Sequence, residues 1–189
     1  MKKFLLTVLF LNAFMNNSYG QEKEFVFSKE RLTDFVVTDF EGKSQSELFR
    51  KTLDWVAITY KNPKEVIKAQ IENEYIRIEG SSDDIFCIKA LGQVGCQEGI
   101  YQIEISFKDN KYKFDIIELK RYIVPSQYVN GGWSNFDLNS NEEYYNKKGE
   151  IRNTYKLFAE RIPNYFNNLN SSLKEFVLND NIPSKSSDW

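Results

Sequence analysis

Apolar and polar side chains alternate almost without interruption between residues 99 and 119, and this alternation is the strongest constraint on the fold. In YQIEISFKDNKYKFDIIEL, apolar residues occupy every second position on both sides of Asp109 and Asn110. A period of two residues is typical of a strand with one buried and one solvated face. Asp and Asn tolerate the backbone of a tight turn. The pattern therefore predicts an antiparallel hairpin, and its slip at Ile117 predicts a bulge.

Other segments before residue 123 also carry strand patterns. In all, we expect strands at 31–40, 66–71, 75–80, 85–91, 99–108 and 111–122. The polar stretch GSSDD is interpreted as a turn between two of these strands. On the first strand, Phe35 and Val37 are expected to face the core.

Two helices complete the expected fold. Ser44 and Glu47 form the S-x-x-E pattern of a helix start, and an apolar stripe continues to Tyr60. A second helical pattern begins at residue 151, and Pro163 either kinks that helix or starts a new one. This order predicts an α+β domain, an antiparallel sheet of about five or six strands with two helices packed on one face.

Trp55 in the first helix has two interpretations. It lies seven residues beyond Leu48, hence two turns on, so both residues extend the edge of the apolar stripe. Packing in the core is favoured, because an aromatic residue at helical spacing is usually buried. A platform for a ligand is the alternative.

The first twenty residues have the pattern of a secretory signal peptide. Two lysines precede a short apolar run, and small residues at 18 and 20 predict cleavage between Gly20 and Gln21. The mature chain is then expected to be periplasmic or secreted, and no later segment is apolar enough to cross a bilayer.

The mature chain, 21–189, is expected to form one domain. Its core is placed at 31–122, followed by an irregular loop at 123–149 and a C-terminal helical segment at 150–178. The full chain has 25 basic and 27 acidic residues, and cleavage removes two lysines. The net charge falls to about −4 without any basic block, so no nucleic-acid partner is expected.

Cys87 and Cys96 are the two cysteines of the chain, and histidine is absent. An even count in an oxidising compartment favours a disulfide between them, with two reduced cysteines as the alternative. Two sulfurs without histidine fall short of the four ligands of a zinc site, so no metal and no cofactor is expected. The lack of histidine also removes Ser–His and Cys–His activation of a nucleophile.

Paired carboxylates are the remaining route to catalysis. The visible pairs lie in expected turns or loops, where solvated acids are the default, and they are Glu72 with Glu74, Asp83 with Asp84, and Glu142 with Glu143. Glycosidase-type chemistry needs two carboxyl groups at a fixed separation, which adjacency in sequence does not supply. No catalytic residue is assigned, and a non-enzymatic role is expected.

Aromatic residues interrupt the polar loop SQYVNGGWSNFDL. Tyr128, Trp133 and Phe136 are the candidate binding residues, because aromatic side chains displayed on a loop commonly bind sugars, peptides or a protein surface. In the alternative interpretation they fold back over the core or the sheet edge. The polar face of the sheet is a second candidate surface, for which plain solvation is favoured.

A resemblance to a known family rests on GKSQSELFRKTLDWVAITYKNPKEVIKAQIENEYIRIEG (42–80) and on the later hairpin. A Trp-containing helix, a turn, a strand and a short I-x-I-x-G strand resemble a secreted bacterial family described as a domain of unknown function with a TBP-like fold. The resemblance covers roughly residues 31–122 and the following helix, and implies a curved antiparallel sheet with two helices on one side. It implies no activity, since fold does not determine function.

These observations predict a non-enzymatic binding or interaction module of the bacterial cell envelope. Its expected partner is an envelope protein or a glycan, and it is not expected to be an integral membrane protein. The alternative is a carboxylate-dependent hydrolase that acts on envelope polymers.

Overall fold

The computed structural model describes residues 24–179. The expected signal peptide and its cleavage site at Gly20 and Gln21 lie outside this range. In chain order, the elements are β1 (Phe35–Asp39), α1 (Gln45–Thr59), α2 (Pro63–Val66), β2 (Ile67–Ile71), β3 (Tyr75–Ala90), β4 (Gln93–Lys108), β5 (Lys111–Ile123), β6 (Gly132–Asn135), the 3-10 turns η1 (Glu142–Tyr144) and η2 (Asn153–Tyr155), and α3 (Lys156–Leu178).

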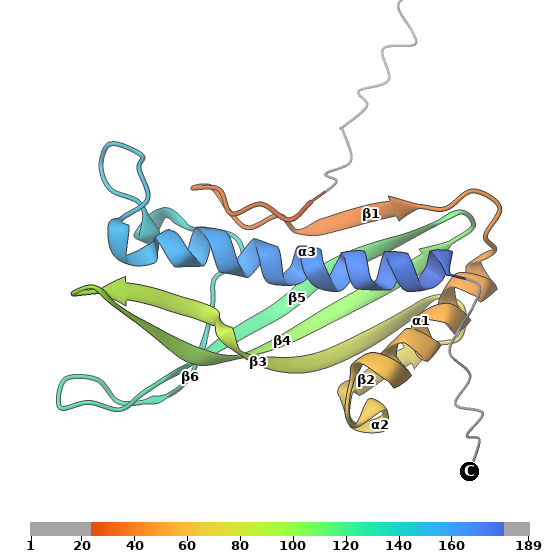
Figure 1. Ribbon diagram of the computed structural model, residues 1–189, viewed down its shortest axis with the longest axis horizontal. Helices are drawn as coiled ribbons and strands as arrows, with labels where there is room; N and C mark the ends of the chain where they lie inside the picture. The colour runs from red at the N-terminus through yellow and green to blue at the C-terminus, as the bar shows by residue number, and fades with distance from the viewer. Residues whose placement is uncertain (1–23, 180–189) are drawn as a thin grey trace, which may run out of the picture.

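The six strands form one antiparallel sheet in the order β1-β5-β4-β3-β2, and β6 pairs with β5 beyond the end of β1. The expected α+β class is therefore confirmed. Figure 1 shows the sheet curving beneath α3, which runs along most of its length, while α1 covers one end.

Strands β3 and β4 are longer than the sequence indicates. The expected turn at GSSDD is wrong, because β3 continues through it to Ala90 and pairs with β4 on both sides. The register shifts between Ser82 and Phe86, so the polar stretch is a bulge inside one strand. The predicted bulge at Ile117 is confirmed, since Gln102 pairs with Glu118 while the next residue of β4 pairs with Ile116.

Strand β1 presents the face opposite to the expected one. Val36 and Thr38 are buried, whereas Phe35 is exposed and Val37 is half-buried. A strand of β-branched and aromatic residues gives no clear alternation, so its facing is set by pairing with β5, where Phe114 is buried opposite Val36. The expected inward facing of Phe35 and Val37 is wrong.

Helix α1 begins as predicted. The Ser44 side chain accepts a hydrogen bond of 3.2 Å from the backbone N–H of Glu47. Trp55 is 1% exposed, and its indole Nε1 donates to the Ser172 hydroxyl of α3 over 3.1 Å. This tryptophan therefore packs in the core and joins the two helices.

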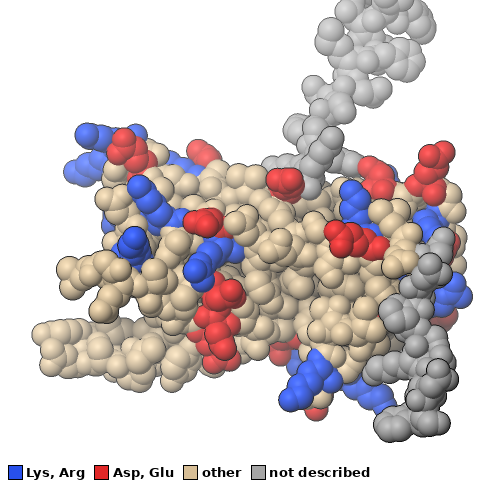
Figure 2. All heavy atoms as spheres, viewed as in Figure 1, with Lys and Arg blue, Asp and Glu red and all other residues tan. Residues whose placement is uncertain are grey.

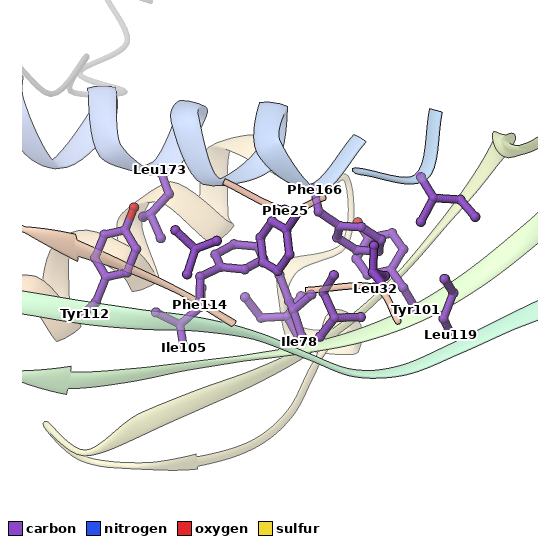
Figure 3. Packing of buried hydrophobic residues seen from close by; sticks show 14 of the residues in the cluster. Phe25, Leu32, Ile78, Tyr101, Ile105, Tyr112, Phe114, Leu119, Phe166 and Leu173 are labelled. Carbon is purple, nitrogen blue, oxygen red and sulfur yellow. The ribbon is translucent and has the colours of Figure 1, made fainter. Parts of the chain in front are cut away.

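Helix α3 is one continuous helix that contains Pro163. Its buried stripe covers the inner face of the sheet, as the close view in Figure 3 shows for Phe166 and Leu173 above Tyr101 and Phe114. Each fully buried aromatic side chain of this kind contributes on the order of 3 kcal/mol of transfer free energy. None of the helices in residues 24–179 is long and apolar enough to cross a membrane.

Candidate functional site

Two hairpins project from the same end of the sheet. Because Gly99 of β4 pairs with Arg121 of β5, the turn between β3 and β4 and the loop between β5 and β6 leave the sheet in one direction. Figure 1 shows both reaching beyond the start of α3, at the left of the view. We call residues 90–97 and 122–136 together the hairpin end.

The hairpin end carries no charged residue, although charged residues make up 28% of the chain. Figure 2 shows it as two arms without Lys, Arg, Asp or Glu atoms. Twelve large hydrophobic side chains are exposed among the described residues, and six of these lie in the hairpin end: Leu91, Val94, Val124, Tyr128, Val129 and Trp133. Exposed apolar side chains are therefore concentrated in these two short segments.

The β5–β6 loop displays two of the three aromatic residues expected there. Tyr128 is 86% exposed, and Trp133 is partly exposed at the start of β6. The Trp133 ring packs against its cross-strand neighbour Tyr122, with ring centroids 5.4 Å apart. Such a pair fixes the orientation of the indole and leaves part of it open to solvent.

Phe136 is placed differently from the prediction. It is 5% exposed and stacks on Tyr144, with ring centroids 5.7 Å apart. The chain returns to the sheet at this point, because the backbone N–H of Phe136 donates to the Leu119 carbonyl over 2.8 Å. The expectation that Phe136 is displayed for binding is wrong, and its role is packing.

The β3–β4 tip contains a functional candidate that the sequence analysis missed. Leu91 is fully exposed at 104%, and it takes φ +51° in a two-residue turn with Gly92 at φ +81°. Positive φ at both positions is typical of a type I′ turn, in which Asn or Asp normally precedes Gly. A left-handed leucine costs about 1–2 kcal/mol. The alternation of apolar residues does not show that Leu91 is exposed at a tip. The position of a leucine directly before a turn glycine could have indicated it.

A disulfide joins the two strands behind this tip. Cys87 and Cys96 are directly paired in β3 and β4, with a Cα–Cα distance of 4.0 Å. The Arg161 guanidinium of α3 lies 3.1 Å from the Cys87 sulfur and 3.5 Å from the carbonyl oxygen of Asp84. The projecting hairpin is thus linked covalently within itself and held against α3.

A tyrosine cluster adjoins a pocket of about 550 Å³ between α1, β3 and α3. The Tyr165 hydroxyl donates to Tyr101 over 3.1 Å, and the hydroxyls of Tyr101 and Tyr60 are also 3.1 Å apart. Burial raises the pKa of all three phenols, so they remain neutral donors and acceptors. A side chain on Gly80 would collide with the Tyr101 hydroxyl, so only glycine fits beneath this ring.

The open face of the sheet carries charges that are largely paired with one another. Lys68 contacts Glu79 at 3.0 Å, Arg77 contacts Glu104 at 2.8 Å, and Lys113 contacts Asp115 at 2.7 Å. The Lys68 ammonium is the main reason that the pKa of Glu79 lies below its usual range. Charges of both signs therefore lie next to one another on this face.

The comparisons with known proteins address the fold. The model of DUF4468, a domain of unknown function with TBP-like fold, matches residues 35–121. Over residues 35–121 the chain is similar to this family. The resemblance drawn from the sequence is therefore confirmed. The match contains the β3–β4 tip and ends directly before the uncharged segment 122–136.

Two crystal structures of Bacteroidales proteins share the TBP-like fold. A TBP-like protein from Parabacteroides distasonis is 16% identical, with a TM-score of 0.55 over 77% of this chain and 91% of its own. A DUF4468 family protein from Bacteroides ovatus is 11% identical, with a TM-score of 0.57 over 84% of this chain and 91% of its own. No curated protein sequence matches the chain. At these identities the likeness shows the fold alone.

The acid pairs are spread over the segment that the family model matches and the segment after it. Asp83 and Asp84 lie in the β3 bulge, Glu142 and Glu143 begin η1, and the third pair, Glu72 with Glu74, lies in the turn between β2 and β3. Within residues 24–179, no group of three or more Cys, Asp or Glu side chains could hold a metal ion. The hairpin end is therefore the best-defined candidate site.

Proposed function

We propose that this protein is a non-enzymatic binding module of the bacterial cell envelope and that it binds through the hairpin end. The observation that carries the proposal is the display of six exposed apolar side chains on two uncharged segments. Exposed apolar side chains gathered at one end of a molecule are unfavourable in water, and such surfaces commonly mark interaction sites. The envelope location rests on the signal-peptide pattern at the start of the chain.

The other two surfaces support binding less well. On the open sheet face, cross-strand ion pairs already satisfy the charges, and such pairs need no external partner. In the tyrosine cluster, Tyr101 is buried and its hydroxyl is satisfied by Tyr60 and Tyr165. Of the three surfaces, the hairpin end is the one that displays the largest number of exposed apolar side chains.

Co-sedimentation with the isolated envelope fraction of the producing cell tests the proposal. Purified residues 21–189 should pellet with the envelope in a saturable way, and the double variant Tyr128→Ala/Trp133→Ala should not. Its melting temperature should stay close to that of the wild type, because both side chains are exposed and neither belongs to the buried core.

A matched control replaces an exposed apolar side chain at the other end of the sheet. Ile71→Ala on β2 truncates an apolar side chain that is exposed to about the same fraction as Trp133, and this variant should pellet like the wild type. Equal pelleting of the double variant and the wild type would exclude the hairpin end as the binding surface. A wild-type chain that stays in the supernatant would contradict the binding-module proposal itself.

A further inference from the structure

We infer that the hairpin end binds a lipid surface by shallow insertion of its two tips. This inference rests on the proposed function and names its partner. Four observations carry it: the shape of the tips, their internal backbone hydrogen bonds, the kinds of side chain that they display and the balance of the charges behind them.

The apolar side chains lie on projecting turns, not on a flat or hollowed face. Leu91 is at the tip of one hairpin, and Tyr128 and Val129 are in the turn of the other. Figure 1 shows the two tips as separate projections at one end of the molecule. A fluid lipid interface accepts two separate apolar points, whereas a protein partner would have to supply a matching pocket for each.

The backbone of the tips is hydrogen-bonded within the chain. Ser126 and Val129 exchange two backbone hydrogen bonds of 3.0 and 3.4 Å, and the N–H of Tyr128 donates to the Ser126 hydroxyl. At the other tip, Ala90 pairs with Gln93 across the two-residue turn. Backbone groups with internal partners lose less free energy when they leave water for the interfacial region of a bilayer.

The hairpin end combines the two kinds of side chain that are found in interfacial anchors, aliphatic and amphipathic. The tip residue Leu91 is purely apolar, and Tyr128 and Trp133 combine an apolar ring with a polar group. Tryptophan and tyrosine are enriched at the headgroup level of membranes for that reason. A leucine with left-handed φ at a fully exposed tip breaks the usual turn preference, and an apolar contact in the bound state explains why leucine is used there.

The charges that border the two uncharged segments balance one another. Lys89 and Glu98 border the first, and Arg121 and Asp137 border the second. One basic and one acidic residue at each arm provide no net attraction to anionic headgroups. Insertion should therefore depend on apolar contact, with little effect of headgroup charge or of salt.

Vesicle flotation with residues 21–189 tests the inference. Phosphatidylcholine vesicles and vesicles with added phosphatidylglycerol should bind the wild type within about twofold of each other, at low and at high salt. Leu91→Asn should lower the partition coefficient about tenfold, because it removes the apolar tip. Ile71→Asn, at the other end of the sheet, should leave the coefficient unchanged.

Quenching of tryptophan fluorescence by spin-labelled lipids measures how deeply the two tips lie in the bilayer. Lipids with a spin label near the headgroup should quench part of the tryptophan fluorescence of the wild type, and Trp133→Phe should remove that quenched part. Equal loss of binding in Leu91→Asn and Ile71→Asn would overturn the inference, as would wild-type binding that requires anionic lipid and disappears in salt.

The two proposals fail in distinguishable ways. A chain that pellets with the envelope fraction but binds neither kind of vesicle would overturn the lipid inference and leave a protein or glycan as the partner. A chain that binds neither the envelope fraction nor vesicles would overturn both proposals.

Discussion

Strand β4 has a turn at each end, and the two turns differ in which residue takes the left-handed backbone and in whether that residue is exposed. The turn to β5 contains Asn110 at φ +65°, whose side chain accepts a hydrogen bond of 2.8 Å from Gly42. The turn from β3 contains Leu91 at φ +51° and Gly92, with the leucine fully exposed to solvent. In the first turn, Asn110 suits the left-handed backbone and is hydrogen-bonded to the rest of the fold. In the second turn, Leu91 takes the left-handed backbone and is left exposed.

We interpret this difference as a division along one strand between a turn that stabilises the fold and a turn that serves the proposed binding. Asn110 also connects to the β1–α1 segment, since its N–H donates to Lys43 and its carbonyl accepts from Phe40. The β3–β4 tip depends instead on a disulfide and on the contact with Arg161. At the Asn110 turn the residue suits the left-handed backbone, and the turn stabilises the fold. At the Leu91 turn the residue does not suit this backbone, and the proposed binding role is the better explanation for a leucine there.

The largest expected effect comes from removing the disulfide. The variant Cys87→Ala/Cys96→Ala should lose about 2.5 kcal/mol of unfolding free energy, the chain-entropy value for so short a closed loop. Urea titration measures this loss. Hydrogen exchange should rise more at residues 85–98 than at the Asn110 turn. Equal increases at both ends of β4 would contradict the assignment of the disulfide to the hairpin end alone.

The second effect tests the other turn. Asn110→Leu should lose about 2 kcal/mol of unfolding free energy, because it places leucine in left-handed backbone and removes the hydrogen bond to Gly42. Asn110→Gly is the matched variant, since it keeps the backbone conformation and removes only the side-chain bond. It should lose about 1 kcal/mol. A smaller loss in Asn110→Leu than in Asn110→Gly would show that this turn is not restrained as the structure indicates.

The sequence predicts best where alternation and turn chemistry agree. The hairpin around Asn110, the bulge at Ile117 and the Ser44 cap follow from local patterns, and each is found in the structure. Prediction from local sequence fails where pairing between strands determines the structure. GSSDD has the local composition of a turn, yet continuous pairing with β4 keeps it within β3, and pairing with β5 sets the facing of β1.

The candidate site is only partly predictable for a related reason. Tyr128 and Trp133 could be located because aromatic residues stand out in a polar loop. Phe136 stands out equally, but its backbone bond to Leu119 returns it to the core. No sequence pattern links Leu91 to the aromatic loop, and only the strand register brings both tips to one end of the sheet.

The third change should raise the unfolding free energy, and it tests the difference between the two turns most directly. Leu91→Asn should raise the unfolding free energy by about 0.5–1 kcal/mol, because asparagine tolerates left-handed backbone better than leucine does. The same variant is expected to bind less well through the hairpin end. Urea titration and the binding assay on one protein preparation measure both. A variant that is less stable than the wild type would show that Leu91 packs in the native state and would remove the conflict on which its binding role rests.

The smallest effect concerns the open face between the two ends. The ion pair with Lys68 lowers the pKa of Glu79 in the folded chain below its ordinary value of 4.5. The stabilisation is therefore present above pH 4.5 and is lost as the pH falls through the lower folded-state pKa. Glu79→Gln should reduce the acid sensitivity of the unfolding free energy below about pH 4.5. Near pH 7 the variant should stay within about 0.5 kcal/mol of the wild type, since the pair is partly exposed.

Urea titration across this pH range measures the difference, and hydrogen exchange connects it to the two turns. Because neither turn of β4 depends on the Glu79 carboxylate, exchange rates at residues 85–98 and at Asn110 should respond equally to its replacement. An unequal response would mean that the charges of the open face contribute to the difference between the two ends of β4. The difference between the two turns would then no longer depend on Leu91 and Asn110 alone.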